Sequence, residues 1–238
     1  MENKYNINYQ DQTAVTTSAF AVLMRNVYAW MAGGLALTAL VSYIVALNES
    51  IIYTILSTPV LFWGLFIGEL AMVFILSARI MKMSFQTAMI MFLGYAVLNG
   101  ITMSFIFYAY SSSVIAQTFL ITAGTFAGMS ILGYTSKTDL STFGQIMYMA
   151  LIGLVIATVV NIFWANSGLM MFLNYAGVLI FIGLTAYDTQ KIKNMLQVYS
   201  AAGITDQNNK IALMGSLSLY LDFINLFLYI LRILGNRK

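Results

Sequence analysis

Two long stretches of this chain, residues 83–136 and 140–187, contain no charged side chain. Each is about twice as long as the roughly 20 residues that one helix needs to cross a bilayer. Their apolar runs are continuous rather than alternating in short segments, which favours helices over a membrane barrel. Since a helix satisfies its own backbone polar groups in lipid, each stretch is interpreted as a pair of membrane-spanning helices.

The turn inside each pair is expected where small polar residues interrupt the apolar run, at residues 110–113 and at residues 165–168. Three further apolar runs bring the number of predicted spans to seven: residues 26–48, 50–78 and 211–231. The sequence therefore predicts an all-α, seven-transmembrane-helix bundle. We expect one integral membrane domain over residues 1–238, with a short cytoplasmic N-terminal tail at residues 1–25.

The composition agrees with a surface that faces lipid. The chain is 61% hydrophobic and 8% charged, whereas a soluble domain is about half apolar and about a quarter charged. The net charge of +3 is small and no basic cluster is long, so we expect no nucleic-acid partner. The chain has no Cys and no His, which excludes thiol chemistry and imidazole metal sites. We expect no organic cofactor, and any proton uptake near neutral pH must use carboxyl groups.

The basic residues indicate how the chain crosses the membrane. In the seven-span arrangement most of them fall on one side, which the positive-inside rule identifies as cytoplasmic. These residues are Lys4, Arg25, Arg79, Lys82, Lys137, Lys191, Lys193 and Lys210. Three others fall on the opposite side: Arg232, Arg237 and Lys238. We expect the orientation in the membrane to follow the larger group of eight. The predicted location is the cell (cytoplasmic) membrane, multi-pass, with the N-terminus cytoplasmic.

Two pairs of glycines have the spacing that permits close helix approach, Gly64–Gly68 and Gly124–Gly128. In a chain with 17 glycines the same spacing also arises by chance. Both readings remain open from the sequence.

Three acidic residues lie within predicted spans, where charge is costly and usually functional: Glu69, Asp188 and Asp222. Asp222 shares one helix face with Ser218 and Asn225, which marks these two as possible pore-lining residues together with Glu69. One reading of this polar face is a hydrogen-bonded packing seam with a neutral Asp222. We favour an ion or proton site, because Asn or Ser would serve packing at lower cost.

The surroundings of the other candidates leave alternatives open. Asp188 precedes Lys191 and Lys193, so it fits either a functional carboxylate or a solvated residue at an emerging helix end. Arg79 fits either an anchor at the inner surface or a partner for an acid on another helix.

Two aspartates on neighbouring helices would have a definite chemistry if they met. Such a pair shares one proton and titrates as a unit. When both are ionised, they offer hard oxygen ligands suited to Ca²⁺. Counting at 1.5 Å per residue, however, places Asp188 about 28 Å down its span and Asp222 about 16 Å up the next. Spacing alone does not bring the two together.

Three motifs resemble the Bax-inhibitor family of multi-pass membrane proteins. Residues 183–193 (GLTAYDTQKIK) resemble its signature, residues 219–227 (LYLDFINLF) its last helix, and residues 27–38 its first. The resemblance implies two three-helix layers around a central C-terminal helix. It also implies a pH-sensitive calcium leak channel in which Asp188 and Asp222 are the paired, pH-sensing and Ca²⁺-binding acids.

The same resemblance implies further roles and partners. Arg79 would be the gate or latch that binds the acid pair. Ca²⁺ would be the permeant ion, and protons and the lipid bilayer the other partners. A membrane-bound quality-control protease is a further partner that the resemblance suggests.

Two rival functions come from other classes. An intramembrane aspartyl protease also carries two aspartates on neighbouring spans, but it resembles Gly-x-Gly-Asp at the second site and has a Pro-Ala-Leu turn after it. Here residues 219–222 read LYLD and the only proline is Pro59, so we expect no enzyme. A non-transporting interaction protein that modulates a membrane-bound quality-control protease or a stress response remains the alternative.

Overall fold

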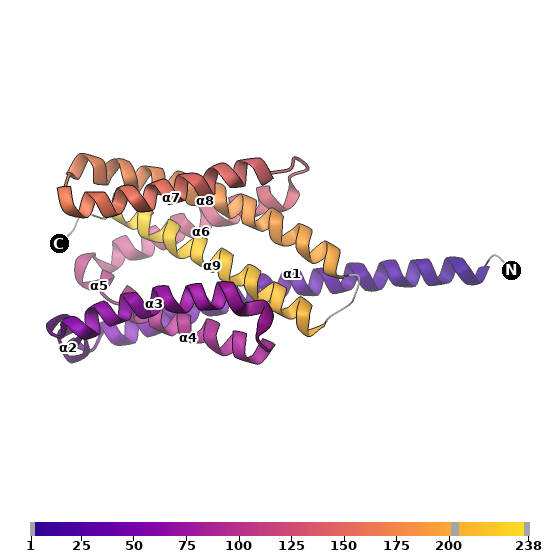
Figure 1. Cartoon of the computed structure of the whole chain (residues 1–238), viewed down its shortest axis with the longest axis horizontal. Helices are drawn as coiled ribbons and strands as arrows, with labels where there is room; N and C mark the ends of the chain where they lie inside the picture. The colour runs from indigo at the N-terminus through magenta and orange to yellow at the C-terminus, as the bar shows by residue number, and fades with distance from the viewer. Residues whose placement is uncertain (1–2, 201–204, 236–238) are drawn as a thin grey trace. The chain divides into compact units, whose positions relative to one another are not determined.

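The computed structural model describes residues 3–200 and 205–235, with side chains from Ser18 onward. Within these residues the chain is helical and has no strand, so the predicted all-α class is confirmed (Figure 1). Seven of its helical segments are long and apolar enough to cross a membrane, as predicted. They are Ser18–Ala46, Pro59–Lys82, Phe85–Ala109, Ser112–Thr135, Ser141–Trp164, Ser167–Tyr199 and Asp206–Leu234.

The labels in Figure 1 follow chain order. The elements are α1 (Asn3–Ala46), α2 (Glu49–Ser57), α3 (Pro59–Arg79), η1 (Ile80–Lys82), α4 (Phe85–Met103), α5 (Ile106–Ala109), α6 (Ser112–Thr135), α7 (Ser141–Trp164), α8 (Ser167–Tyr199) and α9 (Asp206–Leu234). The residues of the predicted tail that the structure describes therefore continue the helix of the first span.

Both predicted turns within the uncharged stretches are confirmed, and local chemistry explains them. The Ser111 side chain caps α6 by accepting a hydrogen bond from the backbone N–H of Val114. At the other turn, Ala165 adopts the left-handed conformation with φ of 48°, which ends α7. The Asn166 side chain then accepts from the backbone N–H of Leu169 and starts α8.

The predicted second span, residues 50–78, is divided in the structure. Its first part forms the separate helix α2, capped by the side chain of Asn48, and α3 begins at Pro59. Proline lacks the N–H that a continuing helix needs and favours extended backbone in the residue before it. Thr58 is extended accordingly, so the spanning helix begins later than the apolar pattern alone predicts.

The third span contains a break that the sequence does not mark with Pro or Gly. Helix α4 ends at Met103 and α5 begins at Ile106, leaving a turn at Ser104 and Phe105. Just before this turn, the hydroxyl oxygen of Thr102 lies 2.9 Å from the backbone carbonyl oxygen of Asn99, which its single proton can bind as an alternative to Glu69. Such a side-chain bond competes with the helix ladder and weakens it locally.

The chain forms two compact units. Unit 1 comprises Met1–Thr102 and Ile192–Leu217. Within it α1 packs closely on α4, where the hydroxyl of Thr38 donates to the carbonyl of Ala96 at 2.9 Å. A Cβ at Gly100 would meet the carbonyl oxygen of Thr38 at 2.8 Å, so glycine is required for this approach.

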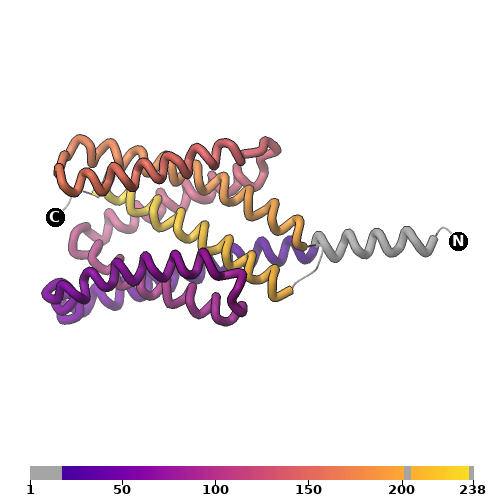
Figure 2. Tube along the Cα trace, viewed as in Figure 1, coloured from indigo at the N-terminus to yellow at the C-terminus, as the bar shows by residue number. Residues whose placement is uncertain are grey.

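Unit 2 comprises Met103–Lys191 and Ser218–Lys238. Within it α7 and α8 run antiparallel from the tight turn at Ala165 (Figure 2). The core cluster draws on α7, α8 and the second half of α9, and consists of Leu154, Leu173, Ile180, Phe181, Leu184, Leu226 and Ile230. The first three spans thus belong mainly to unit 1, the next three mainly to unit 2, and α9 contributes to both.

Helix α9 is the most buried of the seven candidate spans, with 72% of the residues in its most apolar window buried inside the structure. A helix that carries a polar face in a membrane protein is expected to be shielded from lipid in this way.

Candidate functional site

Asp188 is a buried residue of α8 with a single direct side-chain donor among the described residues. It is only 4% exposed, and α8 continues beyond it to Tyr199. The hydroxyl of Tyr148 on α7 donates to its two carboxyl oxygens, at 3.1 Å and 3.3 Å. The reading of Asp188 as a solvated residue at an emerging helix end therefore does not fit the structure.

Asp222 lies on α9 and is 5% exposed. Its Oδ2 atom is buried and has no hydrogen-bond partner among the described residues. The Asp188 carboxylate acts on it electrostatically, and both residues belong to unit 2. A buried carboxyl oxygen without a donor is costly unless it is protonated or meets a cation. This atom is therefore the one in the pair best suited to take up a proton or a cation.

The structure brings Asp188 and Asp222 within electrostatic reach, which the spacing argument did not. The difference comes from the start of the last helix. Helix α9 begins at Asp206 rather than at Ile211, and α8 extends to Tyr199, so both helices are longer than the apolar runs. The length of an uncharged run underestimates the length of a helix whose ends are polar.

Two glycines allow the neighbouring helices to approach α8 beside the acid pair. A Cβ at Gly133 on α6 would collide with the backbone carbonyl of Ala186. A Cβ at Gly144 on α7 would collide with the ring of Tyr187. The two contacts involve the two residues just before Asp188, and the contact at Gly144 lets α7, which carries Tyr148, approach α8 closely.

Polar contacts fix the end of α8 that follows Asp188. The side-chain amide of Gln190 donates to the carbonyl of Thr138 and accepts from the backbone N–H of Leu140, both at 2.8 Å. Gln190 thereby holds the short connection between α6 and α7. In the same connection, hydrogen bonds from the hydroxyl and backbone N–H of Ser141 hold the pKa of Asp139 below its usual value.

Glu69 lies in unit 1 and has its own hydrogen-bond donors. The side-chain amide of Asn99 donates to one carboxyl oxygen, and the hydroxyl of Thr102 donates to the other at 3.0 Å. Both donors are on α4, three residues apart on one face. The structure therefore gives Glu69 partners on a neighbouring helix, and its pore-lining role stays a prediction.

Arg79 also belongs to unit 1 and is exposed at the last turn of α3. A cation at this position complements the negative end of the helix dipole. The gate or latch role of Arg79 toward the acid pair stays a prediction.

Ser218 and Asn225 are half-buried residues of α9 that lie on either side of Asp222 in sequence. The side-chain amide of Asn225 donates to the carbonyl of Leu221 at 2.8 Å, within the same helix. Among the described residues, neither side chain hydrogen-bonds to the acid pair, and their pore-lining role stays a prediction.

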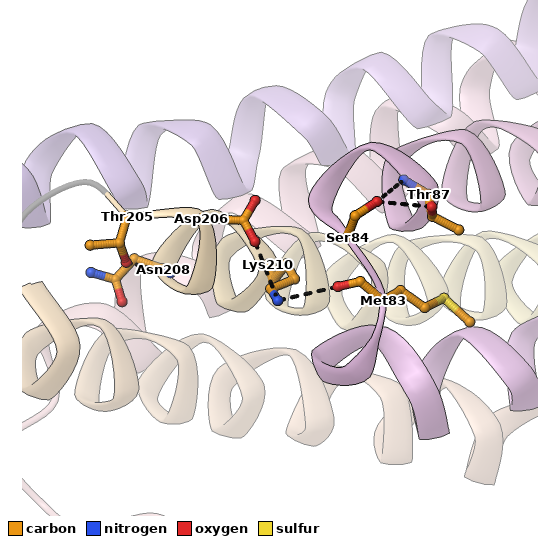
Figure 3. A network of polar contacts seen from close by, with 7 residues as sticks. All are labelled: Met83, Ser84, Thr87, Thr205, Asp206, Asn208 and Lys210. Carbon is orange, nitrogen blue, oxygen red and sulfur yellow. Dashed lines mark hydrogen bonds and ion pairs between the residues drawn. The ribbon is translucent and has the colours of Figure 1, made fainter.

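A polar network in unit 1 anchors the start of α9 (Figure 3). Lys210 forms an ion pair with Asp206 at 3.3 Å and donates to the carbonyl of Met83 at 3.2 Å. Met83 and Ser84 form the turn between η1 and α4, where Ser84 and Thr87 share a hydrogen bond. The lysine thus joins the first turn of α9 to the segment that follows Arg79 in the chain.

The acid pair is a small set of ligands. No group of three or more His, Cys, Asp or Glu side chains gathers as a metal cluster among the described residues. Calcium held firmly in proteins takes about six to eight oxygen ligands. Two carboxyl groups and one hydroxyl can therefore meet a hydrated, passing cation or share a proton, but they do not form a complete cage.

Tyr148 is the site residue that sequence reasoning missed. It lies in an uncharged span where its ring fits the apolar pattern, and it is 39% exposed. The available signal was its phenolic hydroxyl, a polar group that usually finds a partner when it lies at membrane depth. Which partner it finds depends on the packing of α7 on α8.

Comparison with known proteins identifies relatives over nearly the whole chain. The sequence model of the family described as "Inhibitor of apoptosis-promoting Bax1" matches residues 21–238. The Inner membrane protein YbhL of Escherichia coli (strain K12) is 46% identical over 215 residues, which cover 90% of this chain and 92% of the relative. An uncharacterised protein of Borreliella burgdorferi is 42% identical over 215 residues, with the same two coverages. One of Deinococcus radiodurans is 41% identical over 224 residues, 94% of each chain.

Proposed function

The chain belongs to the Bax-inhibitor family, and from this premise we propose that it is a pH-sensitive calcium leak channel gated by the Asp188–Asp222 pair. One observation carries the proposal: two buried carboxyl groups interact within unit 2, and one oxygen of Asp222 has no hydrogen-bond partner among the described residues. Such an oxygen is suited to a proton or to a cation.

Protons and Ca²⁺ compete for the same oxygens in this proposal. With one proton shared, the pair carries a single negative charge and is a poor ligand for a divalent ion. With both carboxyl groups ionised, the pair attracts Ca²⁺ but repels itself unless a cation is present. The chain has no His, so no imidazole competes for the role of proton acceptor.

The decisive experiment measures Ca²⁺ flux in proteoliposomes across about pH 5–8, the range around neutrality in which an isolated Asp would not titrate. Wild type, Asp188→Asn, Asp222→Asn and the double variant are compared. Each single variant should abolish or move the midpoint of the leak, and the double variant should add little, because coupled residues are not additive. Asp139→Asn, at an exposed carboxylate outside the spans, is the matched control and should keep the wild-type midpoint.

Two outcomes would contradict the proposal. If both single variants keep the wild-type midpoint, the pair does not gate the leak and Glu69 becomes the next candidate. If well-folded wild-type protein supports no flux at any pH, the chain is not a channel. The alternative of a non-transporting protein that modulates a membrane-bound protease then stands instead.

Arg79 is proposed as the latch that holds the channel closed by binding the ionised pair. Its guanidinium is exposed at the end of α3 and is suited to a carboxylate in two parallel hydrogen bonds. Arg79→Ala should raise the basal Ca²⁺ leak, whereas Lys82→Ala, at an exposed cation of the next turn, should not. An unchanged or lower leak in well-folded Arg79→Ala protein would leave Arg79 as a surface anchor.

A further inference from the structure

Unit 2 contains a cavity of about 430 Å³ that is separate from the acid pair. Its lining comes from the connection after α5, the end of α7, the start of α8 and the end of α9. Among the described residues, no carboxylate lines it and one cation does. The lining residues are Tyr110, Thr158, Asn161, Ile162, Met170, Leu173, Asn174, Tyr229, Arg232 and Gly235.

Arg232 supplies the charge of this cavity from the last turn of α9. Its guanidinium lies 5.2 Å from the centre of the Tyr229 ring. Tyr229 in turn stacks on Phe181 and packs against Gly177, where a Cβ would meet its ring at 2.6 Å. The Tyr229 ring is therefore held in place by Phe181 and Gly177, and it in turn fixes the position of the Arg232 guanidinium.

Asn174 supplies a hydrogen-bonding group to the same lining. It is 9% exposed and lines the cavity. Its amide can donate hydrogen bonds to an oxygen of a ligand in the cavity. Asn161 is also buried, but its side-chain oxygen already accepts from the backbone N–H of Asn166.

The surface beside the cavity is strongly apolar. Ile162, Phe163 and Trp164 close α7 and are 73%, 84% and 76% exposed. Exposed aromatic residues at the end of a span are typical of the interface between lipid tails and headgroups. The cavity therefore lies where a ligand could place an anionic group on Arg232 and an apolar part along these side chains.

We propose that this cavity binds a phosphate-bearing anion, with Arg232 and the Asn174 amide as the groups that hold the phosphate oxygens. Arginine is suited to phosphate because its planar fork donates two parallel hydrogen bonds. The same chemistry is offered by the headgroup of an anionic phospholipid and by free phosphate. The apolar rim at Ile162, Phe163 and Trp164 favours the lipid as the source.

Fluorescence of Trp164 can test the proposal in the full-length protein. The chain has three Trp, so Trp30→Phe and Trp63→Phe leave Trp164, beside the cavity, as the sole reporter. The protein is reconstituted with brominated phosphatidylglycerol or with brominated phosphatidylcholine, and quenching gives the preference for the anionic lipid. Arg232→Gln should lower this preference about tenfold, as expected for the loss of a hydrogen bond to a charged group.

Asn174→Leu roughly keeps the side-chain volume and should lower the same preference. It provides a second test of the proposal if Arg232→Gln folds poorly. Arg25→Gln, the same substitution at an exposed arginine outside the cavity, should leave it unchanged. If millimolar inorganic phosphate abolishes the preference of wild type, the site is confirmed and takes free phosphate as well. If the preference of wild type survives phosphate but falls in Arg232→Gln, the lipid headgroup is the source. A preference that neither variant nor phosphate alters would overturn the proposal.

Discussion

At the scale of single residues, the chemistry of the acid pair depends on how few hydrogen bonds it receives. Asp188 accepts from the Tyr148 hydroxyl, whereas the Oδ2 atom of Asp222 has no partner among the described residues. The two carboxyl groups are therefore inequivalent. We expect the proton of the pair to reside preferentially on Asp222, because a hydrogen bond from a hydroxyl favours the ionised form of Asp188.

Tyr148→Phe tests this inequivalence without altering the volume of the ring. The variant removes the donor to the ionised Asp188, so protonation becomes easier and the pH midpoint of the leak should move upward. The expected shift is about one pH unit, the equivalent of one hydrogen bond to a charged group. Tyr175→Phe, at an exposed tyrosine of α8, is the matched control and should keep the midpoint. A Tyr148→Phe midpoint equal to that of wild type would remove Tyr148 from the site.

The sequence could point to the acids but not to their geometry. Asp188 and Asp222 stand out because charge at membrane depth is costly, and this holds whatever their neighbours are. Tyr148 does not stand out, because tyrosine is compatible with lipid, with packing and with hydrogen bonding. Its role follows only from the packing of α7 against α8, which depends on residues distant in the chain.

At the scale of the helices, glycine positions decide which pairs approach closely. The Gly-x-x-x-Gly spacings did not mark packing seams: a Cβ at Gly64, Gly124 or Gly128 would meet no atom within 4 Å, and one at Gly68 meets only an ordinary contact. Gly133, which lacks the spacing, is the glycine of α6 that α8 packs against. Spacing shows that two glycines share a face, but not that another helix covers the face.

The effects of Gly133→Ala and Gly128→Ala on the stability of the protein should therefore differ, although both glycines lie on α6. At Gly133 the new methyl group collides with the backbone of Ala186, which cannot rotate away, so we expect a loss of about 1–3 kcal/mol of stability. At Gly128 the methyl group enters open space and should be neutral or slightly stabilising, since alanine favours helices. Thermal unfolding in detergent, followed by circular dichroism, measures both variants. Equal unfolding temperatures would contradict the close α6–α8 contact.

Helix boundaries were predictable where the chain carries local stop signals and not elsewhere. The turns before Ser112 and after Trp164 follow from serine capping and from an Ala-Asn connection. The division at Thr58 follows from Pro59, a signal that the count of apolar residues overlooks. The break at Ser104 has no such signal, so a residue-by-residue reading extends α4 through it.

At the scale of the whole molecule, the number of spans fixes the relation between the two ends of the chain. Seven crossings place the N-terminus and the C-terminus on opposite sides of the membrane. The basic residues predict a cytoplasmic N-terminus, with Arg232, Arg237 and Lys238 as the exceptions. Arg232 lies against the Tyr229 ring and lines a cavity. These contacts explain why a basic residue is placed on the side opposite to the cytoplasm.

We therefore predict that the C-terminus is external and that every connection on the basic side is cytoplasmic. Fusions at Lys238 and in the connection around Lys137 should give opposite results with a reporter that is active only outside the cytoplasm. The Lys238 fusion should be active and the Lys137 fusion inactive, because an odd number of crossings separates the C-terminus from the cytoplasmic side. As a control, a fusion after residue 112 should behave like the one at Lys238. An inactive Lys238 fusion would require an even number of crossings, as would follow if α9 did not span the membrane despite its length and apolar composition.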